Sequence, residues 1–564
     1  MNRILALALL IAGPLSCAAQ ATGATTPADA STSFPPVPAA PPAPRPAGIP
    51  PDDKLEASGA RIGKVLINRK NVFDTTLVEE DRPLFRFANW LHIETRESTI
   101  QDKLLFRPGD RYDPRLLLES ERLLRAAQFL HDAHILPVAY DNGLVDIEVS
   151  TQDVWTFQPN VSFGRKGGKN SSGFSLEETN LLGTGKELGI ASKSSTERDS
   201  KSLMYRDRQV GGSWWSLTTK YADNSDGSTK ELELERPFYA LDTRWAGGVL
   251  VKDDRRVDSL YQQGVISNQF ETRERQQTVY GGWSAGLRDG WVTRWTAGVS
   301  SSKHTATPST AVLLPALPAQ RVDLVYPWVG IEWIEDDFRQ TSNLDQIGKT
   351  EDVPFGWHTQ LTLGQATTGL GSDRNAGVFD LKVSKGLQAP PKHTLLLTGT
   401  AKGRIEHGDP AGALFGTTAR YYYRRSPARS FFMSGSYDRG IRLDGDQQLL
   451  LGGENGLRGY PQYYQAGDKR WLFTMEERVF TDWYVFQLFR IGGAVFFDMG
   501  RASGGPPAAR AASQGVLKDA GFGLRLGSSR TGFGNVIHID VAFPLDGDKS
   551  ISRTQLILET KRSF

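Results

Sequence analysis

The sequence has little of what stabilises most large chains. Its one cysteine in 564 residues is Cys17, so the chain beyond that point has no disulfides. After the N-terminal segment, no uninterrupted apolar run reaches the roughly 20 residues that a membrane-spanning helix needs. Hydrophobic residues make up only 39% of the chain, which is little for a core that is apolar on both sides. A structure with one apolar face fits this composition better.

Charge of one sign is also missing. The 66 basic and 64 acidic residues are interspersed and leave a formal net charge of +2, so nothing favours a nucleic-acid partner. The eight histidines are scattered, and no Ser-His-Asp order stands out. His131 and His134 follow a predicted helix, where a charge partner for the helix end fits better than a metal site. We therefore expect no metal, no cofactor and no catalytic residues.

The N-terminus has the pattern of a cleaved secretory signal. A charged start is followed by an apolar run over 4–12 and by the small-residue site Ala19-Gln20-Ala21. We assign residues 1–21 to the signal peptide, which would carry Cys17 away. A lipoprotein site at Cys17 fits less well, because Pro14 stands where leucine is expected. Residues 22–59, rich in proline and alanine, are predicted to form a flexible linker.

Residues 60–152 predict a compact α+β domain. A strand is expected in "RIGKVLINRKNVF", a helix in "RPLFRFANWLHI" and another strand in "TIQDKLLF". An amphipathic helix should then begin at Asp113 as N-cap with Pro114 at its first position. Its buried side is predicted to contain Leu116, Leu117, Leu123, Leu124 and Leu130. Two short strands, joined by a tight turn at Asn142-Gly143, close the domain.

From Trp155 onward the hydrophobic period is two. In "WVTRWTAGV", for example, Trp291, Trp295 and Val299 lie on one face, and Arg294 and Thr296 on the other. Such segments of about ten residues recur to the C-terminus. A water-soluble sandwich would bring more Val, Ile and Leu and earlier turns. We therefore predict an all-β transmembrane antiparallel barrel over 153–564, with about 16 strands and 20 as the upper limit.

A glycine-rich stretch over 452–470, "GGENGLRGYPQYYQAGDKR", first suggests a phosphate-binding loop. Such a loop needs a helix opening after it, and no helical period follows here. Within the stretch, Leu457-Arg458-Gly459-Tyr460 instead matches the [VIL]-R-G-[YF] signature of the Omp85 superfamily of outer-membrane assembly and translocation barrels.

Further motifs follow in the order of that family. Glu476-Glu477-Arg478 is similar to its E-x-R strand, and "GAVFFDMG" over 493–500 is similar to its F-x-D-x-G strand. "NLLGTGKE" from Asn180, "DAGFGLRLGSS" from Asp519 and "IDVAFPL" from Ile539 also match. Over roughly residues 155–564 the chain thus resembles an Omp85 barrel of the BamA and TamA kind, and residues 60–152 resemble a single POTRA domain, the periplasmic module of that superfamily.

Residue parity by itself places Asp498 on one face with Phe496 and Ala494, opposite the apolar Val495 and Phe497. Arg458, on a loop between strands, would then reach Glu476 and Asp498 inside the barrel, with charge-assisted hydrogen bonds worth about 1.5–3 kcal/mol each. The resemblance implies that this contact pins the loop in the lumen and that Leu457, Gly459, Tyr460 and Arg478 belong to the same site. It also implies that Phe564 is the C-terminal signal read by the barrel assembly machinery.

The resemblance implies a location in the outer membrane of a Gram-negative bacterium, with the POTRA-like domain in the periplasm. The expected partners are outer-membrane lipids and a client polypeptide, which the domain would capture by strand addition. Strands near 155–163 and 553–564 would form a weak seam. The leading hypothesis is a non-enzymatic barrel that helps insert or translocate polypeptides. The alternatives are a structural or passive pore protein and a lipid-modifying enzyme carried by the barrel.

Overall fold

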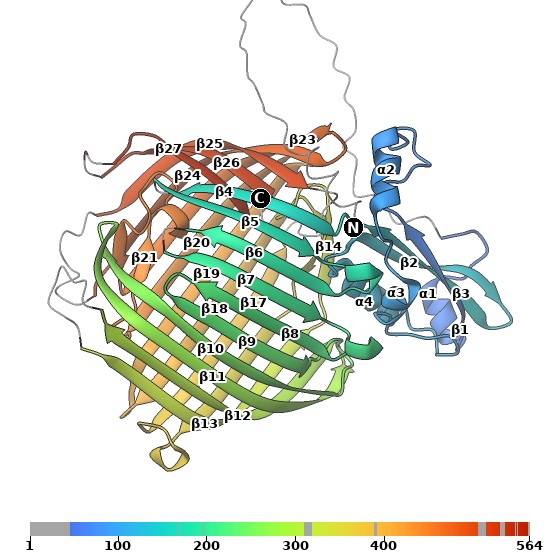
Figure 1. Ribbon diagram of the computed structural model, residues 1–564. Helices are drawn as coiled ribbons and strands as arrows, with labels where there is room; N and C mark the ends of the chain where they lie inside the picture. The colour runs from blue at the N-terminus through green and yellow to red at the C-terminus, as the bar shows by residue number, and fades with distance from the viewer. Residues whose placement is uncertain are drawn as a thin grey trace, which may run out of the picture.

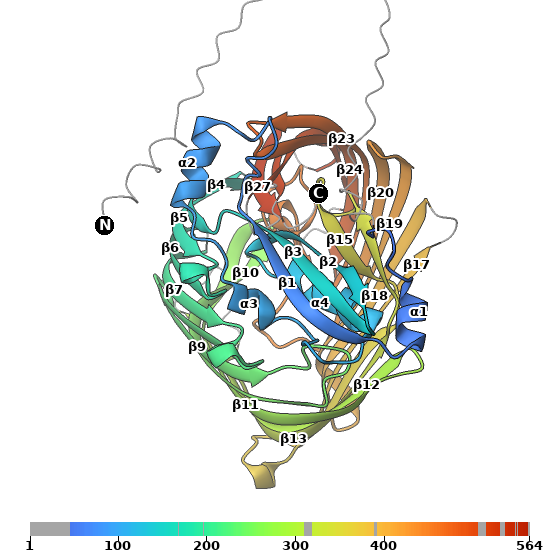
Figure 2. The same cartoon turned by 90° about the vertical axis from the view of Figure 1, so that its right-hand side faces the viewer.

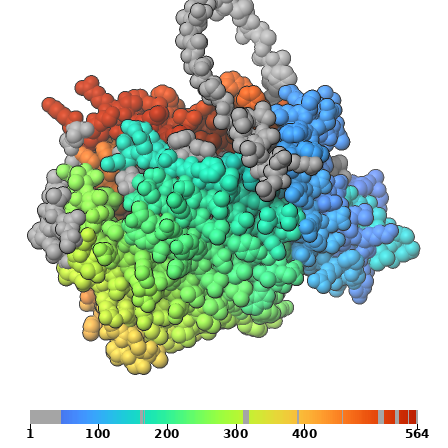
Figure 3. Space-filling view, viewed as in Figure 1, coloured from blue at the N-terminus to red at the C-terminus, as the bar shows by residue number. Residues whose placement is uncertain are grey.

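The computed structural model describes residues 45–166, 168–195, 197–309, 318–388, 392–505, 515–528, 530, 536–547, 549 and 551–561. A small α+β domain lies against one end of a β-barrel (Figure 1, Figure 3). The predicted signal peptide, most of the predicted linker and Phe564 lie outside the described residues.

The N-terminal domain has a three-stranded sheet in the order β1-β3-β2, with β1 parallel and β2 antiparallel to β3. Its elements are α1 (Asp52–Ala57), β1 (Arg61–Lys70), α2 (Pro83–Leu91), α3 (Glu97–Gln101), α4 (Pro114–Arg125), β2 (Leu130–Asp141) and β3 (Leu144–Asp153). The predicted strand at 99–106 is wrong. Ile100 enters the core from α3 and Phe106 enters it from the turn that follows, so the apolar residues of this segment pack without strand geometry.

The folded domain begins before residue 60. Leu55 of α1 is fully buried in the same cluster as Ile62, Leu117 and Leu124. The flexible linker therefore does not extend to residue 59 in the structure, because a short helix with one well-placed leucine completes the domain's core.

Helix α4 begins as its sequence predicts. The Asp113 carboxylate accepts a hydrogen bond from the backbone N–H of Arg115 at 2.9 Å, and Pro114 is the first helical residue. Leu117 and Leu124 enter the core, whereas Leu116 and Leu123 are half-buried and Leu130 belongs to β2. The opposite, polar side of α4 is buried as well, since it faces the barrel.

The barrel is closed by 20 antiparallel strands. These are β4 (Phe157–Lys166), β5 (Lys169–Glu178), β6 (Glu187–Ser194), β7 (Asp199–Asp207), β8 (Ser216–Asn224), β9 (Gly227–Arg236), β10 (Trp245–Gln262), β11 (Val265–Arg288), β12 (Trp291–Pro308), β13 (Gln320–Glu335), β16 (His358–Ala366), β17 (Ala376–Gln388), β18 (His393–Glu406), β19 (Asp409–Ser426), β20 (Arg429–Ile441), β23 (Lys469–Val485), β24 (Phe489–Ser503), β25 (Leu517–Ser528), β26 (Val536–Pro544) and β27 (Gln555–Lys561).

The predicted barrel is confirmed, and its strand number lies at the upper limit of the expected range rather than at about 16. The difference arises in β5 to β9, which have only 8 to 10 residues each. Short strands with mixed polar residues give a weak alternating signal, so separate strands are difficult to distinguish there by sequence.

The two faces of the barrel wall differ as the alternation predicts. On β12, Trp291, Trp295 and Val299 point outward with 41%, 51% and 54% of their surface exposed. Arg294, between them, is buried on the inner side and donates a hydrogen bond to Glu332 at 2.9 Å. An apolar outer wall around a polar interior is what a closed sheet needs in order to face lipid. Among the described helices, none is long and apolar enough to cross a membrane.

The N-terminal domain contacts the turns at one end of the barrel, called here the near end. Its sheet lies across the opening at that end, the mouth of the barrel (Figure 2). Glu119 of α4 accepts a hydrogen bond from the N–H of Leu241 at 2.8 Å, and Asn180 donates one to Thr95 at 2.8 Å. Gly183 has a φ of +75°, and a Cβ at this position would lie 2.4 Å from the carbonyl oxygen of Glu94. The motif "NLLGTGKE" thus fits closely against the domain.

His131 and His134 lie in β2 rather than at a helix end, which corrects the expectation that they follow α4 as its charge partners. The His134 imidazole lies 3.4 Å from Asp132 and 3.4 Å from Glu121. The hydrogen bond to Asp132 and then that to Glu121 raise the pKa of His134 to about 9.

The contribution of His134 to the stability of the domain should therefore fall as the pH rises above 6.5. Because the folded pKa exceeds the unfolded value of 6.5, stabilisation by His134 is complete below pH 6.5 and is lost as the pH rises through the folded pKa. Between pH 6.5 and 8 we expect this contribution to fall by about 1–2 kcal/mol. It is measured at each pH as the difference in thermal midpoint between the unsubstituted protein and His134→Gln.

Other groups of the domain also titrate in this range, so the comparison with His134→Gln is needed. Burial lowers the pKa of both His92 and His131 to about 4, but in the unfolded chain both imidazoles titrate near 6.5, so their contribution to stability rises with pH. Burial raises the pKa of Asp153 to about 6 and lowers that of Lys103 to about 8. These contributions are common to both chains and cancel in the difference. A difference in midpoint that stays constant from pH 6.5 to 8 would contradict the role assigned to His134.

Candidate functional site

The site is built on the long connection between β20 and β23. The chain enters β4 from the N-terminal domain and successive strands are antiparallel, so β20 ends at the far end of the barrel. The connection, residues 442–468, contains the short strands β21 (Leu449–Leu451) and β22 (Gln465–Gly467), which pair with each other. Between them lies the short 3-10 helix η4 (Gly453–Asn455), followed by the predicted loop motif.

The Arg458 side chain lies in the barrel interior between two strands. Its Nε and one terminal nitrogen donate to the two oxygens of Asp498 at 2.6 and 2.9 Å, a bidentate pair. The other terminal nitrogen donates to Glu476 at 2.8 Å. The Asp498 and Glu476 side chains are 1% and 6% exposed, and that of Arg458 is 7% exposed. The structure therefore brings together the three charged groups that the sequence singles out.

Two further groups complete the surroundings of the guanidinium. The Phe496 ring lies beneath it, with 3.4 Å from the central carbon to the ring centroid. Asp540 of β26 lies 3.6 Å from a terminal nitrogen and also pairs with Arg525. Buried charged groups that lie this close together are stable only where each has a partner of opposite charge. The loop supplies the cation and the wall supplies the carboxylates, so each balances the charge of the other.

Apolar contacts and one glycine fix the rest of the motif. Leu457 and Tyr460 are fully buried in one cluster with Leu451 and Leu517. The Tyr460 hydroxyl lies 2.7 Å from the carbonyl oxygen of Lys518. At Gly459 a Cβ would lie 2.6 Å from the Cβ of Asp519 and 3.0 Å from the backbone nitrogen of Pro544. Any larger residue would push the loop off the wall.

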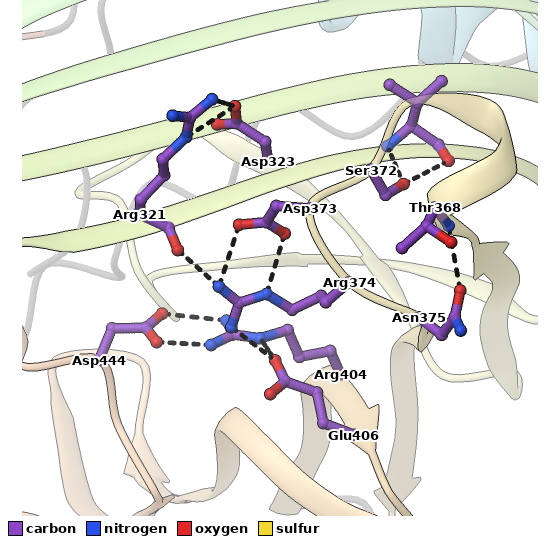
Figure 4. Close-up of polar contacts among 11 residues, drawn as sticks. Arg321, Asp323, Thr368, Ser372, Asp373, Arg374, Asn375, Arg404, Glu406 and Asp444 are labelled. Carbon is purple, nitrogen blue, oxygen red and sulfur yellow. Dashed lines mark hydrogen bonds and ion pairs between the residues drawn. The ribbon is translucent and has the colours of Figure 1, made fainter.

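Charged residues at the far end of the barrel bind the first part of the connection between β20 and β23 (Figure 4). Arg404 of β18 donates to both oxygens of Asp444 at 3.0 and 2.5 Å. Arg374, between β16 and β17, contacts Asp373 and Glu406 and donates to the carbonyl oxygen of Arg321 at 2.6 Å. These residues thus hold the connection at its start, and Arg458 holds it inside the lumen.

A second segment enters the barrel from the opposite end. Between β13 and β16, the strands β14 (Phe338–Ser342) and β15 (Thr350–Pro354) form a hairpin, called here the mouth hairpin, over 338–354. Leu344 at its tip packs with Tyr422 and Phe432 of the barrel. Ile347 packs with Phe480 of β23.

The loop and the mouth hairpin meet at Arg478. Its Nε donates to Glu476 at 2.9 Å, and one terminal nitrogen donates to the carbonyl oxygen of Leu344 at 3.1 Å. On its outer side the hairpin reaches the N-terminal domain, where Arg125 donates to both oxygens of Asp352 at 2.8 Å. Polar contacts at Leu344 and at Asp352, joined by the hairpin itself, therefore link the loop from the far end to the domain at the near end.

Sequence reasoning missed part of this site. Asp540 lies inside the matched segment "IDVAFPL", and it shares a face with the buried His538 and Ala542, so parity could have found it. The mouth hairpin has no comparable signal, because it is short and its role depends on where the barrel places it. Phe564, the other predicted residue, lies outside the described residues.

A cavity of about 1080 Å³ remains in the lumen beside the loop. Its lining is mixed and includes Arg198, Asp380, Lys402 and Arg404. The site as a whole is an arrangement for holding a loop and a hairpin in place inside a polar interior.

No model of a known protein family and no curated protein matches the sequence. Among solved structures, BamA from Haemophilus ducreyi lacking POTRA domains 1–3 matches 88% of this chain and 85% of its own, with 12% identity and a TM-score of 0.39. CdiB from Acinetobacter baumannii matches 89% and 74%, with 10% identity and a TM-score of 0.44. CdiB from Escherichia coli matches 89% and 76%, with 11% identity and a TM-score of 0.45.

Replacing Arg458 by alanine should release the loop from the lumen. The change leaves the Glu476 and Asp498 carboxylates buried without their cation, at a cost of about 3–5 kcal/mol. We expect the barrel to stay folded and the loop to become a site of rapid proteolysis. The exposed Lys469→Ala is the matched control and should leave the loop resistant. A loop that remains equally resistant in Arg458→Ala would contradict the anchoring role.

Shortening the mouth hairpin tests whether it closes the near end. Replacement of residues 339–353 by a short glycine linker removes Leu344 and Ile347 from the interior while leaving all 20 barrel strands. In planar bilayers the shortened protein should conduct several times more ions than the full chain. Arg125→Met, which loosens the hairpin from the domain but keeps its buried tip, should have a smaller effect. Equal conductance of shortened and full chains would show that the hairpin is not a plug.

Proposed function

We propose that the chain is an Omp85-type barrel of the outer membrane that helps insert or translocate polypeptides, with its POTRA-like N-terminal domain in the periplasm. The signal-like N-terminus, the lipid-compatible outer wall and the ordered Omp85 motifs support this location. Its partners would be outer-membrane lipids, a client polypeptide and, for its own insertion, the barrel assembly machinery.

The observation that carries the proposal is the junction where the barrel closes. Strands β27 and β4 lie side by side (Figure 1), and among the described residues one pair, Leu558 and Arg165, is in register. The neighbouring ladders are much longer, with seven pairs between β26 and β27 and ten between β4 and β5. In this proposal the junction, whose ladder is the shortest in the described part of the wall, opens at least cost, and its free edges would accept a strand from a client.

The rest of the site supports a lateral route. The Arg458 loop and the mouth hairpin occupy the interior from opposite ends, so a polypeptide passing along the axis would have to displace both. A client captured by a strand edge of the N-terminal domain, β1 or β2, would instead reach the nearby junction.

A passive pore is the second candidate, and the charged lumen cavity favours it. In that case the two segments in the lumen would limit the flow of small solutes, and the junction would stay closed.

Locking the junction distinguishes the two candidates. The chain has no cysteine after Cys17, so Arg165→Cys with Leu558→Cys introduces one disulfide between neighbouring strands. In proteoliposomes, the oxidised protein should fold an added unfolded reporter barrel at least about tenfold more slowly, equivalent to roughly 1.4 kcal/mol, and reduction should restore the rate.

The control pair Ser172→Cys with Ser194→Cys bridges β5 and β6 within a full ladder and should leave the rate unchanged. Folding that is insensitive to the Arg165–Leu558 disulfide would rule out the lateral route. A full chain that does not accelerate folding and leaves the levels of other barrels and secreted proteins unchanged when depleted would favour the pore.

A further inference from the structure

Helix α2 is separated from the core of its own domain. The domain core is formed by residues of α1, α3, α4 and the sheet. The buried residue of α2, Phe85, belongs instead to a small cluster with Val72 and Phe73, stacked on Phe73 at 4.2 Å between ring centroids. Trp155, just before β4, and Leu488, in the turn between β23 and β24, pack against this cluster.

The segment before α2 is fixed to the barrel beside its closing junction. Arg530, between β25 and β26, donates to the carbonyl oxygen of Val72 at 2.7 Å and forms an ion pair with Glu80. The backbone N–H of Trp155 donates to the carbonyl oxygen of Arg530 at 2.8 Å. Both views place α2 at the perimeter of the barrel mouth, beside β4, while the sheet of the domain lies across the mouth (Figure 1, Figure 2).

The outward side of α2 and of the segment before it is apolar and exposed. Leu84, Phe87 and Trp90 are 56%, 39% and 57% exposed, and Leu77 and Val78 are 50% and 87% exposed. We call this set the α2 patch. Because residues three apart lie on one side of a helix, Leu84, Phe87 and Trp90 form a single stripe.

The apolar surface continues onto the barrel. At the end of β23 and in its turn to β24, Trp483 and Phe486 are 70% and 77% exposed. Leu488 of the same turn packs under α2. The α2 patch therefore extends the outer wall of the barrel at the end where the N-terminal domain sits.

We propose that the α2 patch lies in the lipid leaflet that surrounds this end of the barrel, next to the closing junction. Trp, Phe and Leu on the exposed side of a short amphipathic helix are typical of segments that lie in the membrane interface. A client polypeptide fits the surface less well, since a convex helix offers no strand edge and the sheet of the same domain offers two.

The charges around α2 show no basic excess, since Arg82 and Arg86 are outnumbered by the acidic run over 79–81, so the binding is apolar in origin. Arg86 pairs with Asp81 at 2.7 Å, and Glu80 pairs with Arg530. Lipid contact should therefore not depend on anionic headgroups. The patch would hold the domain at the membrane and disturb lipid packing beside the junction of β27 and β4.

Spin labels on single cysteines test the proposal in the full chain. Leu84→Cys and Phe87→Cys place labels in the patch, and Lys54→Cys on the exposed side of α1 is the control. In phosphatidylcholine vesicles, the ratio of collisions with oxygen to collisions with a water-soluble nickel chelate should be several times higher at positions 84 and 87 than at 54. Adding phosphatidylglycerol should not change this ratio.

Labels at 84 and 87 that match the Lys54→Cys label would overturn the proposal. A high ratio that develops only after an unfolded reporter polypeptide is added would assign the patch to clients and overturn it equally. The doubly substituted Leu84→Ser, Phe87→Ser chain provides a second test, because both residues are exposed and the core is unaffected. A label at Val78→Cys should become more accessible to the nickel chelate in that chain. The proposal requires a barrel in a membrane but no insertion activity, so these results are independent of the disulfide experiment.

Discussion

A buried arginine that must keep its carboxylates determines how the interior of this barrel is organised. Arg458 comes from a loop, whereas Asp498 and Glu476 belong to the wall, and all three side chains are almost fully buried. Removal of the guanidinium or of the carboxylates would leave the opposite charge buried without a partner. The loop is therefore bound to the wall more firmly than its length and glycine content suggest, and the path of the neighbouring residues follows from this contact.

The same contact connects the two ends of the molecule. Glu476 is shared between Arg458 and Arg478, and Arg478 holds the tip of the mouth hairpin. The hairpin in turn pairs with Arg125 of the N-terminal domain through Asp352. A displacement of the loop would thus reach the hairpin through one shared carboxylate. With the interior occupied from both ends, the ladder between β27 and β4 is the shortest of the barrel wall among the described residues.

How far the sequence predicts the site depends on the residue. Asp498 could be placed in the lumen because strand parity is strict: one apolar outer face at Val495 and Phe497 leaves the other face for the interior. The partners of Arg458 followed from a motif match together with that parity. Asp540 was accessible to the same reasoning. Phe87 and Trp90 have the helical spacing that predicts α2, and only the position of the helix at the near end of the barrel shows that both side chains are exposed.

By itself the sequence determined the alternation of the wall, the closed sheet that alternation requires, and the α+β character of the N-terminal domain. These follow from local periods, which act over a few residues. Tertiary structure decided the number of strands, the insertion of the mouth hairpin, the burial of the polar side of α4 and the separation of α2 from its core. Each of these depends on which surfaces meet after the barrel closes, and a local period carries no information about contacts between residues hundreds of positions apart, such as Arg125 and Asp352.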